Sequence, residues 1–584
     1  MFKRSGYSPL RGLVFVCIAV APAVAQYDPP AGYYNSAVGL TGAPLKSALN
    51  AIIDGHTTIT YANREARLEI LDQDPANSAN VIEVYSGYSV PKTDFLPGVT
   101  PANTEHLWPN AYGIDDVNPA YGDLFNLRPC DTEVNSERAN KYYDDGGTLP
   151  AHPEAPLCRD DADSWEARPV EKGDLARSMF YMDTRYEGDL ATDGFANNLT
   201  LTDNVALITG TATNMGKLST LINWHFSDAV DESERQRNHI IYQTTYLGVT
   251  FQQNRNPFID HPEYVWAIWG PTPNDSRLYL GATEPGDGAS LVAVDLGEVI
   301  VNGTVPGPQN VTLNKVGTNP TTYDIALSGD GSSTAAGTRQ SFLGGVQNRV
   351  IAVGLTTSTA TAGVKSGELT VNNTDLTSSG AGRGDADGDD VADVSLRVLD
   401  HANGSFDDAV DQNTLTLDFG TVDAGTGLHN LGFTIYSLES TPGFTAALDL
   451  DAIGGTGDTA ALTTDAAPLS NLPAGTGQAF TAWLDSASVG SFSATYTISG
   501  SDQDLSGAQP TSDLVLTLVG EVVSACAAAD TNCADGVTLD DVEPFVNVLL
   551  ELASPCSSCA VDTNNDNFRN AADVQLFVDA LLGI

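Results

Sequence analysis

The chain has 584 residues, with 27 Lys and Arg against 75 Asp and Glu, which gives a formal net charge of −48. One hydrophobic core rarely serves so long a chain, so we expect three to five domains. The acidic composition favours an exported protein with a soluble surface, and it argues against a protein that binds nucleic acid mainly through many phosphate contacts.

The first 25 residues have the pattern of a secretory signal peptide. Basic side chains precede an apolar run, which ends in the small-residue motif Ala-Val-Ala before Gln26. This pattern predicts cleavage after residue 25 and a secreted or cell-surface location. No later segment reaches the roughly 20 continuous apolar residues that a membrane helix needs, so we expect no membrane span.

Six cysteines remain after removal of the signal peptide, an even number that favours disulfide bonds in an exported chain. Cys130 and Cys158 are alone in the front half, so we expect them to pair. The other four lie near the C-terminus and are expected to form two bridges of open connectivity: Cys526, Cys533, Cys556 and Cys559.

Residues 26–275 have a mixed composition in which helix patterns alternate with loops. Residues 44–55 begin with proline and end with glycine, as helices often do. Residues 172–188 carry apolar side chains at helical spacing, and residues 231–248 begin with acidic residues, which suit a helix N-terminus. We interpret the apolar stripes of these segments as core rather than as cofactor contacts.

The segment NTEHLWPNAYG, residues 103–113, places Glu105 beside His106, and a segment rich in Asn and Arg follows at 121–140. Hydrolysis of a phosphodiester needs a base that deprotonates water, a cation that neutralises developing charge and donors that hold the phosphate. His106 is the candidate base. A histidine beside a glutamate is more often an ordinary surface or core residue, so this pair alone favours the structural interpretation.

The second segment offers ligands for a metal and for phosphate. Asn135, together with Glu105 or Asp131, could hold a hard divalent ion through oxygen. Arg138 lies three residues after Asn135, so the two share a face if this segment is helical. The forked guanidinium of Arg138 could bind phosphate.

Residue identity over a longer span favours the catalytic interpretation. Four blocks occur in order: EHLWP, DLFNLRPCDTEVNSERAN, KGDLARSMFYMDTRYEG and RNHIIYQ followed by NRNPFIDHPE. With these blocks the chain resembles the endonuclease I family of secreted bacterial nucleases, within the His-Me finger (ββα-metal) superfamily. The resemblance covers about 240 residues, nearly all of the front half.

The resemblance implies a single-metal endonuclease that acts on DNA, and in some members on RNA, without strict sequence preference. It implies that His106 is the general base and that Glu105 is a Mg²⁺ ligand. Asn135 matches the asparagine that opens the finger helix and binds the metal, and Asn126 is the second choice for that ligand. Arg138 is the expected phosphate contact.

Glu105 and His106 present a geometric difficulty, because neighbouring residues of a regular strand point to opposite faces. A bend near Pro109, or a ligand role through water, would allow both side chains to reach one phosphate.

From residue 285 to 523 the composition changes to Thr, Val, Gly, Ser and Asp in short alternating runs, which is typical of all-β sandwiches. Residues 294–304 resemble residues 417–427. We therefore predict two related immunoglobulin-like sandwiches, at 285–408 and 409–523, without a catalytic role. Residues 384–394 carry aspartates at calcium-loop spacing but lack a closing glutamate, and we favour a solvated acidic hairpin.

Residues 526–584 contain a second repeat, in which 530–550 aligns with 562–582. Each copy places Asp at positions 1 and 12 of a loop that precedes an apolar helix, which is EF-hand-type spacing with Asp in place of Glu at position 12. The pair resembles a dockerin-type module, which implies bound Ca²⁺ and a cohesin-like or cell-surface partner; the alternative is a pair of acidic capped hairpins. The expected calcium ligands are Asp530, Asn532, Asp535, Asp541, Asp562, Asn564, Asp566, Asn570 and Asp573.

The sequence thus predicts a multidomain protein: a signal peptide, an α+β His-Me finger nuclease domain at 26–275, two all-β immunoglobulin-like sandwiches and a small α-helical, dockerin-like calcium module at 526–584. The favoured function is a secreted Mg²⁺-dependent endonuclease that acts on DNA, with RNA as an alternative substrate. A second hypothesis is a catalytically inactive surface adhesion or scaffold protein.

Overall fold

The structure is a computed structural model, and it describes residues 27–95, 101–192, 194–285, 289–336, 340–373, 387–523, 528–532, 536–552, 560–564, 566 and 568–584. The predicted signal peptide lies outside these residues. The chain forms two compact units. The first comprises the chain up to Asp295 with Gly307–Thr356 and Ser366–Ser395, and the second comprises Leu296–Pro306, Thr357–Lys365 and Leu396–Ile584.

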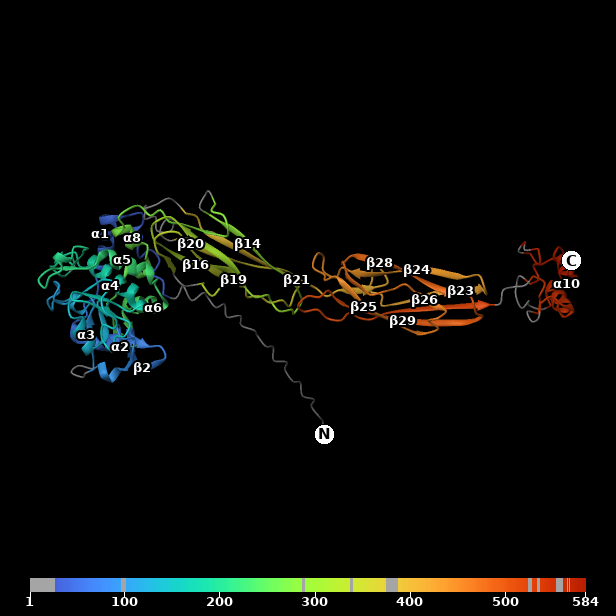
Figure 1. Cartoon of the computed structure of the whole chain (residues 1–584), viewed down its shortest axis with the longest axis horizontal. Helices are drawn as coiled ribbons and strands as arrows, with labels where there is room; N and C mark the ends of the chain where they lie inside the picture. Colours follow the sequence, from blue (N-terminus) through green and yellow to red (C-terminus); the bar gives the residue numbers. More distant parts are fainter. Residues whose placement is uncertain are drawn as a thin grey trace, which may run out of the picture. The chain divides into compact units, whose positions relative to one another are not determined.

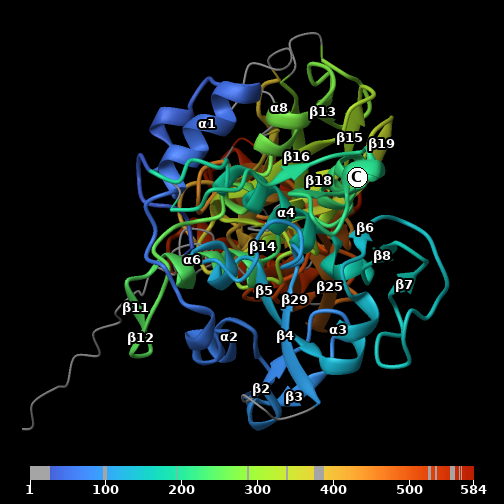
Figure 2. The same ribbon diagram turned by 90° about the vertical axis from the view of Figure 1, so that its left-hand side faces the viewer.

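The front region is α+β, as predicted, and Figure 1 labels its helices except α7; Figure 2 shows the region from another side. All three predicted helices are present, because α1, α4 and α6 fall on the expected segments. The helices are α1 (Gly42–Ile53), α2 (Glu65–Leu71), α3 (Thr132–Arg138), α4 (Lys172–Arg185), α5 (Leu218–Ser227), α6 (Glu232–Tyr242), α7 (Pro257–Asp260) and α8 (Tyr264–Trp269).

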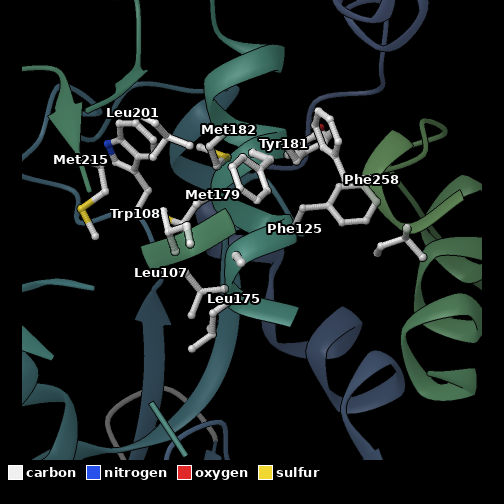
Figure 3. Packing of buried hydrophobic residues seen from close by; sticks show 14 of the residues in the cluster. Leu107, Trp108, Phe125, Leu175, Met179, Tyr181, Met182, Leu201, Met215 and Phe258 are labelled. Atoms are coloured by element: carbon white, nitrogen blue, oxygen red, sulfur yellow. The ribbon is translucent and has the colours of Figure 1, made fainter. Parts of the chain in front are cut away.

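Helix α4 is buried on every side from Leu175 to Arg185 and forms the centre of the front core. Figure 3 shows Leu175, Met179 and Met182 of this helix beside Leu107 and Trp108. Leu107 and Trp108 directly follow His106 in the sequence. The chain that leaves the candidate base is therefore anchored in the main hydrophobic core.

The strands of the front region are short. They form the sheets β1–β2–β3, β4–β5 and β6–β8–β7 and the pairs β9–β10 and β11–β12. Their bounds are β1 (Gln73–Asp74), β2 (Asn77–Ile82), β3 (Ser89–Pro91), β4 (Ala102–His106), β5 (Leu127–Asp131), β6 (Tyr142–Tyr143), β7 (Arg159–Asp160), β8 (Ser164–Glu166), β9 (Thr200–Leu201), β10 (Asn214–Met215), β11 (Thr245–Tyr246) and β12 (Val249–Thr250).

Two sandwich-like pairs of sheets follow, each with one four-stranded and one five-stranded sheet. In the first pair the sheets are β13–β15–β19–β17 and β14–β21–β20–β16–β18. The strands are β13 (Arg277–Leu280), β14 (Leu291–Ile300), β15 (Gln309–Val316), β16 (Thr321–Gly329), β17 (Gly331–Ser332), β18 (Gln340–Phe342), β19 (Gln347–Leu355), β20 (Gly363–Asn373) and β21 (Asp390–Leu399).

The second pair consists of β22–β24–β28–β26 and β23–β30–β29–β25–β27. Strands β14 and β23, which contain most of the sequence repeat, are each the first edge strand of a five-stranded sheet. The strands are β22 (Asn403–Ser405), β23 (Thr414–Asp423), β24 (Leu428–Leu438), β25 (Leu448–Gly457), β26 (Leu462–Thr464), β27 (Leu469–Leu472), β28 (Thr476–Asp485), β29 (Gly490–Asp502) and β30 (Leu514–Val523).

The expectation of a solvated acidic hairpin at 384–394 is wrong for two of its aspartates. Asp387 and Asp390 are buried. Asp387 accepts from the backbone N–H of Leu278 (2.8 Å), and Oδ1 of Asp390 accepts from the backbone N–H (2.9 Å) and the hydroxyl (2.6 Å) of Ser290. These carboxylates tie the start of β21 to neighbouring backbone, and Asp385 lies outside the described residues.

The C-terminal residues contain α9 (Val542–Leu549) and α10 (Asp573–Leu582). The rings of Phe545 and Phe577 stack with centroids 3.8 Å apart. Asp541 and Asp573, at position 12 of the two predicted loops, accept backbone N–H groups of their own loops, from Asn532 and Thr538 and from Asn564 and Asn570 respectively. Asp535, Cys526, Cys533, Cys556 and Cys559 lie outside the described residues.

The predicted disulfide between Cys130 and Cys158 is absent, because both side chains are free, buried thiols. The thiol of Cys158 instead points to the carbonyl oxygen of Tyr85 (3.4 Å). An even number of cysteines is therefore not sufficient to predict a bridge in this core. None of the helices in the described ranges is long and apolar enough to cross a membrane.

Candidate active site

The candidate site is built on a β-hairpin and the helix that follows it. Strands β4 and β5 pair antiparallel, with Glu105 opposite Arg128 and His106 opposite Leu127. Helix α3 begins immediately after β5, and Asp131 caps it by accepting from the N–H groups of Glu133 (2.8 Å) and Val134 (2.9 Å). Figure 2 shows β4, β5 and α3 side by side in this ββα arrangement.

Asn126 closes the long loop between the two strands. Its Oδ1 accepts from the backbone N–H of Trp108 (2.7 Å), and its Nδ2 donates to the Trp108 carbonyl (3.2 Å). Both ends of the buried amide are therefore used. This placement gives Asn126 a role in loop structure, and the Oδ1 that a metal would use already accepts one hydrogen bond.

His106 lies at the end of β4, in contact with two tyrosines. Its Nε2 is 3.0 Å from the carbonyl oxygen of Tyr121. Its ring lies nearly parallel to the rings of Tyr61 (centroids 5.1 Å apart) and Tyr121 (5.0 Å). Because a carbonyl oxygen only accepts, Nε2 carries the proton in the neutral ring, and Nδ1 keeps the lone pair that a base needs.

The surroundings of His106 keep its imidazole neutral at physiological pH. Burial lowers the pKa of His106 to about 4; the hydrogen bond to the Tyr121 carbonyl opposes this shift, and the positive charge of Arg64 adds to it. A neutral imidazole can accept a proton, whereas an imidazolium cannot. The histidine is thus in the protonation state that the predicted base requires.

Glu105 points to the opposite face of β4 and is buried. Its Oε1 accepts from the hydroxyl of Tyr85 (2.8 Å) and forms an ion pair with Nη1 of Arg138 (3.0 Å). Burial raises the pKa of Glu105, although the charge of Arg138 opposes the shift. The regular alternation of the strand therefore holds at these two residues, and Glu105 and His106 point to opposite faces of β4.

Arg138 is also buried and faces the protein interior. Besides Glu105, it donates to the carbonyl oxygens of His106 (3.0 Å) and Leu107 (2.7 Å). These contacts occupy Nη1 and Nη2 with groups of the protein, so the side chain is not placed for the phosphate contact that its spacing suggested. Its contacts fix the end of β4 instead.

Asn135, on the same helix, is partly exposed. Its Nδ2 donates to Oδ1 of Asn103 (2.8 Å) and to the carbonyl of Thr104 (3.2 Å), so these two bonds do not use its Oδ1. One carboxylate, Glu105, and one amide oxygen, Asn135, are hard donors of the kind that bind Mg²⁺ together with water and phosphate oxygens. The donor set thus fits Mg²⁺ in its chemistry, although the described residues contain no group of three His, Cys, Asp or Glu side chains placed to hold a metal.

Sequence reasoning missed three side chains that surround His106. Arg64 donates from Nε to the hydroxyl of Thr104 (2.7 Å), and its guanidinium lies 3.7 Å from the ring centre of Tyr61. The rings of Tyr61 and Tyr121 are 4.3 Å apart. Tyr61 and Arg64 lie about 40 residues before His106, outside every quoted block, and no pattern at that distance marks them.

Buried side chains from later in the chain support the loop that carries Tyr121. Asp123, at the start of DLFNL, accepts from the hydroxyls of Tyr181 (2.9 Å) and Tyr186 (2.7 Å) and from Nε2 of Gln252 (3.0 Å). All four side chains are buried. Tyr181, Tyr186 and Gln252 therefore support the loop that carries Tyr121 and are not themselves candidate catalytic groups.

Comparison with known proteins places the front region in a family. Residues 41–263 match the family described as Endonuclease I. Over 238 residues the chain is 44% identical to a protein of Bacillus amyloliquefaciens named extracellular ribonuclease, a match that spans 41% of this chain and 78% of the relative. A protein of the same name from Bacillus subtilis (strain 168) is 42% identical over 253 residues, 43% of this chain and 83% of the relative.

The structural comparison is weaker. The solved structure of CfaE, the adhesive subunit of CFA/I fimbria of enterotoxigenic Escherichia coli, matches 41% of this chain and 100% of its own at 9% identity, with a TM-score of 0.20. A score this low supports no assignment of the sandwich-like region.

Proposed function

The chain belongs to the Endonuclease I family of nucleases, which are phosphodiester hydrolases and typically metal-dependent, and on this premise we propose that it is an exported endonuclease that cleaves RNA and DNA with little sequence preference. The names of the relatives favour RNA as a substrate. The resemblance carried by the sequence blocks instead implied DNA as the main substrate and RNA as the alternative. Export is supported by the signal pattern of residues 1–25 and by the extracellular relatives.

His106 is the proposed general base, and the observation that carries this role is its hydrogen bond to the Tyr121 carbonyl. The bond fixes the tautomer and the ring orientation, so Nδ1 can take a proton from the attacking water. The adjacent tyrosine rings keep the imidazole partly buried and neutral.

Glu105 and Asn135 are the proposed ligands of a catalytic Mg²⁺. A bound divalent ion would neutralise the charge that develops on the phosphorane and on the leaving oxygen. Arg138 is proposed as a positioning residue: it fixes the carboxylate of Glu105 and the carbonyl of His106 relative to one another. This role replaces the phosphate contact that the sequence suggested for Arg138.

The alternative is a surface adhesion or scaffold protein whose nuclease region is inactive. The acidic balance of the front region favours this alternative, and the intact set of His106, Glu105 and Asn135 argues against it. A single gel separates the two: RNA, single-stranded DNA and duplex DNA are incubated with the purified chain in Mg²⁺ or in EDTA. Cleavage in Mg²⁺ that EDTA abolishes supports the nuclease, and intact substrates in both lanes support the scaffold.

For the remainder of the chain we propose two immunoglobulin-like spacers, at 285–408 and 409–523, after a nuclease domain at 26–275. The C-terminal module, 526–584, is proposed to bind Ca²⁺ and a cohesin-like or cell-surface partner. The matched roles of Asp541 and Asp573 and the stacked Phe545 and Phe577 support a repeated, paired module. Calorimetry of the full chain with Ca²⁺, compared with Asp573→Ala, tests the calcium site.

A further inference from the structure

A partly buried arginine near the candidate active site has no acidic partner. Arg67, in α2, donates from Nε to the carbonyl of Thr250 (2.8 Å) and from Nη1 to the carbonyl of Asn63 (2.6 Å). In the part of the chain that the structure describes, no carboxylate lies within ion-pair distance of Arg67, and burial alone lowers its pKa. Its neighbour Arg64, by contrast, pairs with Glu65 (2.9 Å).

The acidic composition of the front region makes the lack of an acidic partner at Arg67 unexpected. From Gln26 to Pro273 there are 16 Lys and Arg against 35 Asp and Glu, so a cation has many potential partners. A charged group that loses part of its hydration without a counter-charge costs free energy. A guanidinium held by two backbone carbonyls keeps other N–H groups available, and these groups match the geometry of a phosphate.

Arg67 belongs to a row of side chains that leads to His106. Its backbone N–H donates to the carbonyl of Arg64 (3.0 Å), one turn earlier. Arg64 lies over the ring of Tyr61, whose other contacts include His106 and Tyr121. We call Tyr61, Arg64 and Arg67 the η3–α2 row, because they lie in the 3₁₀ turn Tyr61–Asn63 and at the start of α2.

The hairpin β11–β12 borders the η3–α2 row on its far side. Thr250, at the end of this hairpin, accepts the hydrogen bond from Arg67. Figure 2 shows α2 between the hairpin and β4. Leu247, at the hairpin tip, is 75% exposed. The row thus runs from the candidate base to an exposed loop and holds one paired arginine, Arg64, and one arginine without an ion pair in the described residues, Arg67.

We propose that the η3–α2 row binds one unpaired strand of RNA or DNA, with Arg67 in contact with a phosphate adjacent to the scissile one. This inference rests on the proposed nuclease function. Guanidinium planes stack on unpaired bases, and the guanidinium of Arg64, which lies over the ring of Tyr61, offers such a plane near His106. A duplex would bring the phosphates of a second strand to a region with 35 acidic and 16 basic residues, so a single unpaired arginine fits one strand better than two.

The test measures binding first, so that it does not depend on cleavage. The full chain carrying His106→Ala is titrated into a short labelled single strand of RNA, and separately of DNA, by fluorescence anisotropy over a range of salt concentrations. Adding Arg67→Ala should weaken binding about tenfold and reduce the slope of log Kd against log salt by about 0.7, the value for one contact with a single strand. Arg67→Lys should keep the slope.

Arg159→Ala is the matched control, because it removes the same charge from a half-exposed arginine that pairs with Glu166 in another part of the front region. It should change affinity less than twofold and leave the salt slope unchanged. With the active chain, Arg67→Ala should raise KM about tenfold on single strands and change kcat less than twofold, as expected for a contact made equally in the ground and transition states. Circular dichroism checks that each variant is folded.

An unchanged salt slope for folded Arg67→Ala overturns the phosphate contact, and equal, Arg67-dependent binding of a duplex of the same sequence overturns the preference for an unpaired strand. A chain that binds single strands through Arg67 but cleaves none supports this inference and contradicts the proposed nuclease function. A chain that cleaves RNA and DNA without dependence on Arg67 supports the proposed nuclease function and contradicts this inference. The two proposals therefore fail separately.

Discussion

Arg138 joins two neighbouring residues that point to opposite sides of the same strand. Its Nη1 is 3.0 Å from the carboxylate of Glu105 and 3.0 Å from the carbonyl oxygen of His106. Glu105 and His106 therefore do not need to share a face of β4 to be held in fixed relation, because one buried guanidinium contacts both. Arg138 thus fixes the two residues relative to one another, while their side chains stay on opposite sides of the strand.

Replacing Arg138 should destabilise the front region strongly. Arg138→Ala leaves the buried carboxylate of Glu105 without its counter-charge, and breaking a buried pair in this way costs about 3–5 kcal/mol. Urea unfolding followed by tryptophan fluorescence measures the loss. The double variant Glu105→Gln with Arg138→Ala removes both charges and should recover part of it. A loss below about 1 kcal/mol for Arg138→Ala would show that the ion pair does not hold the site.

The two asparagines that the sequence offers as metal ligands, Asn135 and Asn126, should respond differently to replacement by alanine. Asn135→Ala removes an oxygen donor at a partly exposed position, so it should raise the Mg²⁺ concentration needed for half-maximal cleavage while the protein stays folded. Asn126→Ala removes both bonds to Trp108, and buried hydrogen bonds of this kind contribute about 1–3 kcal/mol each when a partner is left unsatisfied. It should lower stability at every Mg²⁺ concentration. Identical Mg²⁺ titrations for wild type and Asn135→Ala would contradict the ligand role.

The buried aspartate of the first sandwich-like region should make stability depend on pH. Burial raises the pKa of Asp390 to about 7 from the ordinary value of 3.8. The native protein therefore binds more protons than the unfolded chain between these values, so Asp390 lowers stability as pH rises through this window. Asp390→Asn keeps the acceptor for Ser290 but cannot ionise.

The measurement for Asp390 is a comparison of urea midpoints at pH 5 and pH 8. Between these pH values, wild type should lose stability relative to Asp390→Asn by about 1 kcal/mol or more, because one pKa unit corresponds to about 1.4 kcal/mol. A constant difference between the two proteins across this range would show that Asp390 keeps the same protonation state.

The two thiols of the front region should be present but protected. Burial raises the pKa of Cys158 to about 12 and raises that of Cys130 well above its ordinary range, so neither thiol forms a reactive thiolate in the native protein. Iodoacetamide should label both residues in urea without a reducing agent and neither in buffer, as read by peptide mass spectrometry. A non-reduced digest in which the two peptides are linked would restore the disulfide that the sequence suggested.

The sequence predicted the secondary structure of the front region well, because its helices have strong local signals. The proline and glycine that bound residues 44–55 and the acidic start of residues 231–248 act within one or two turns, and α1 and α6 are present there. The repeat at 294–304 and 417–427 likewise reflects local alternation, and both segments begin within edge strands.

The features that the sequence did not predict depend on contacts between distant residues. Tyr61 reaches His106 across 45 positions of the chain, and Arg138 reaches Glu105 across 33, so neither contact has a local pattern. The cysteine pairing was wrong because the count of cysteines carries no information about which atoms meet in the core. The same holds for Asp387 and Asp390. The acidic composition of their segment suggested solvent exposure, but their partners are Leu278 on β13 and Ser290 just before β14.

The most direct test of His106 as the base of a phosphodiester hydrolase is cleavage by His106→Ala with and without added imidazole. The rate on RNA and on DNA should fall by about 10²–10⁴-fold at unchanged fold and strand binding, and imidazole should restore part of it by supplying the missing base. Cleavage by His106→Ala at the wild-type rate would contradict the account.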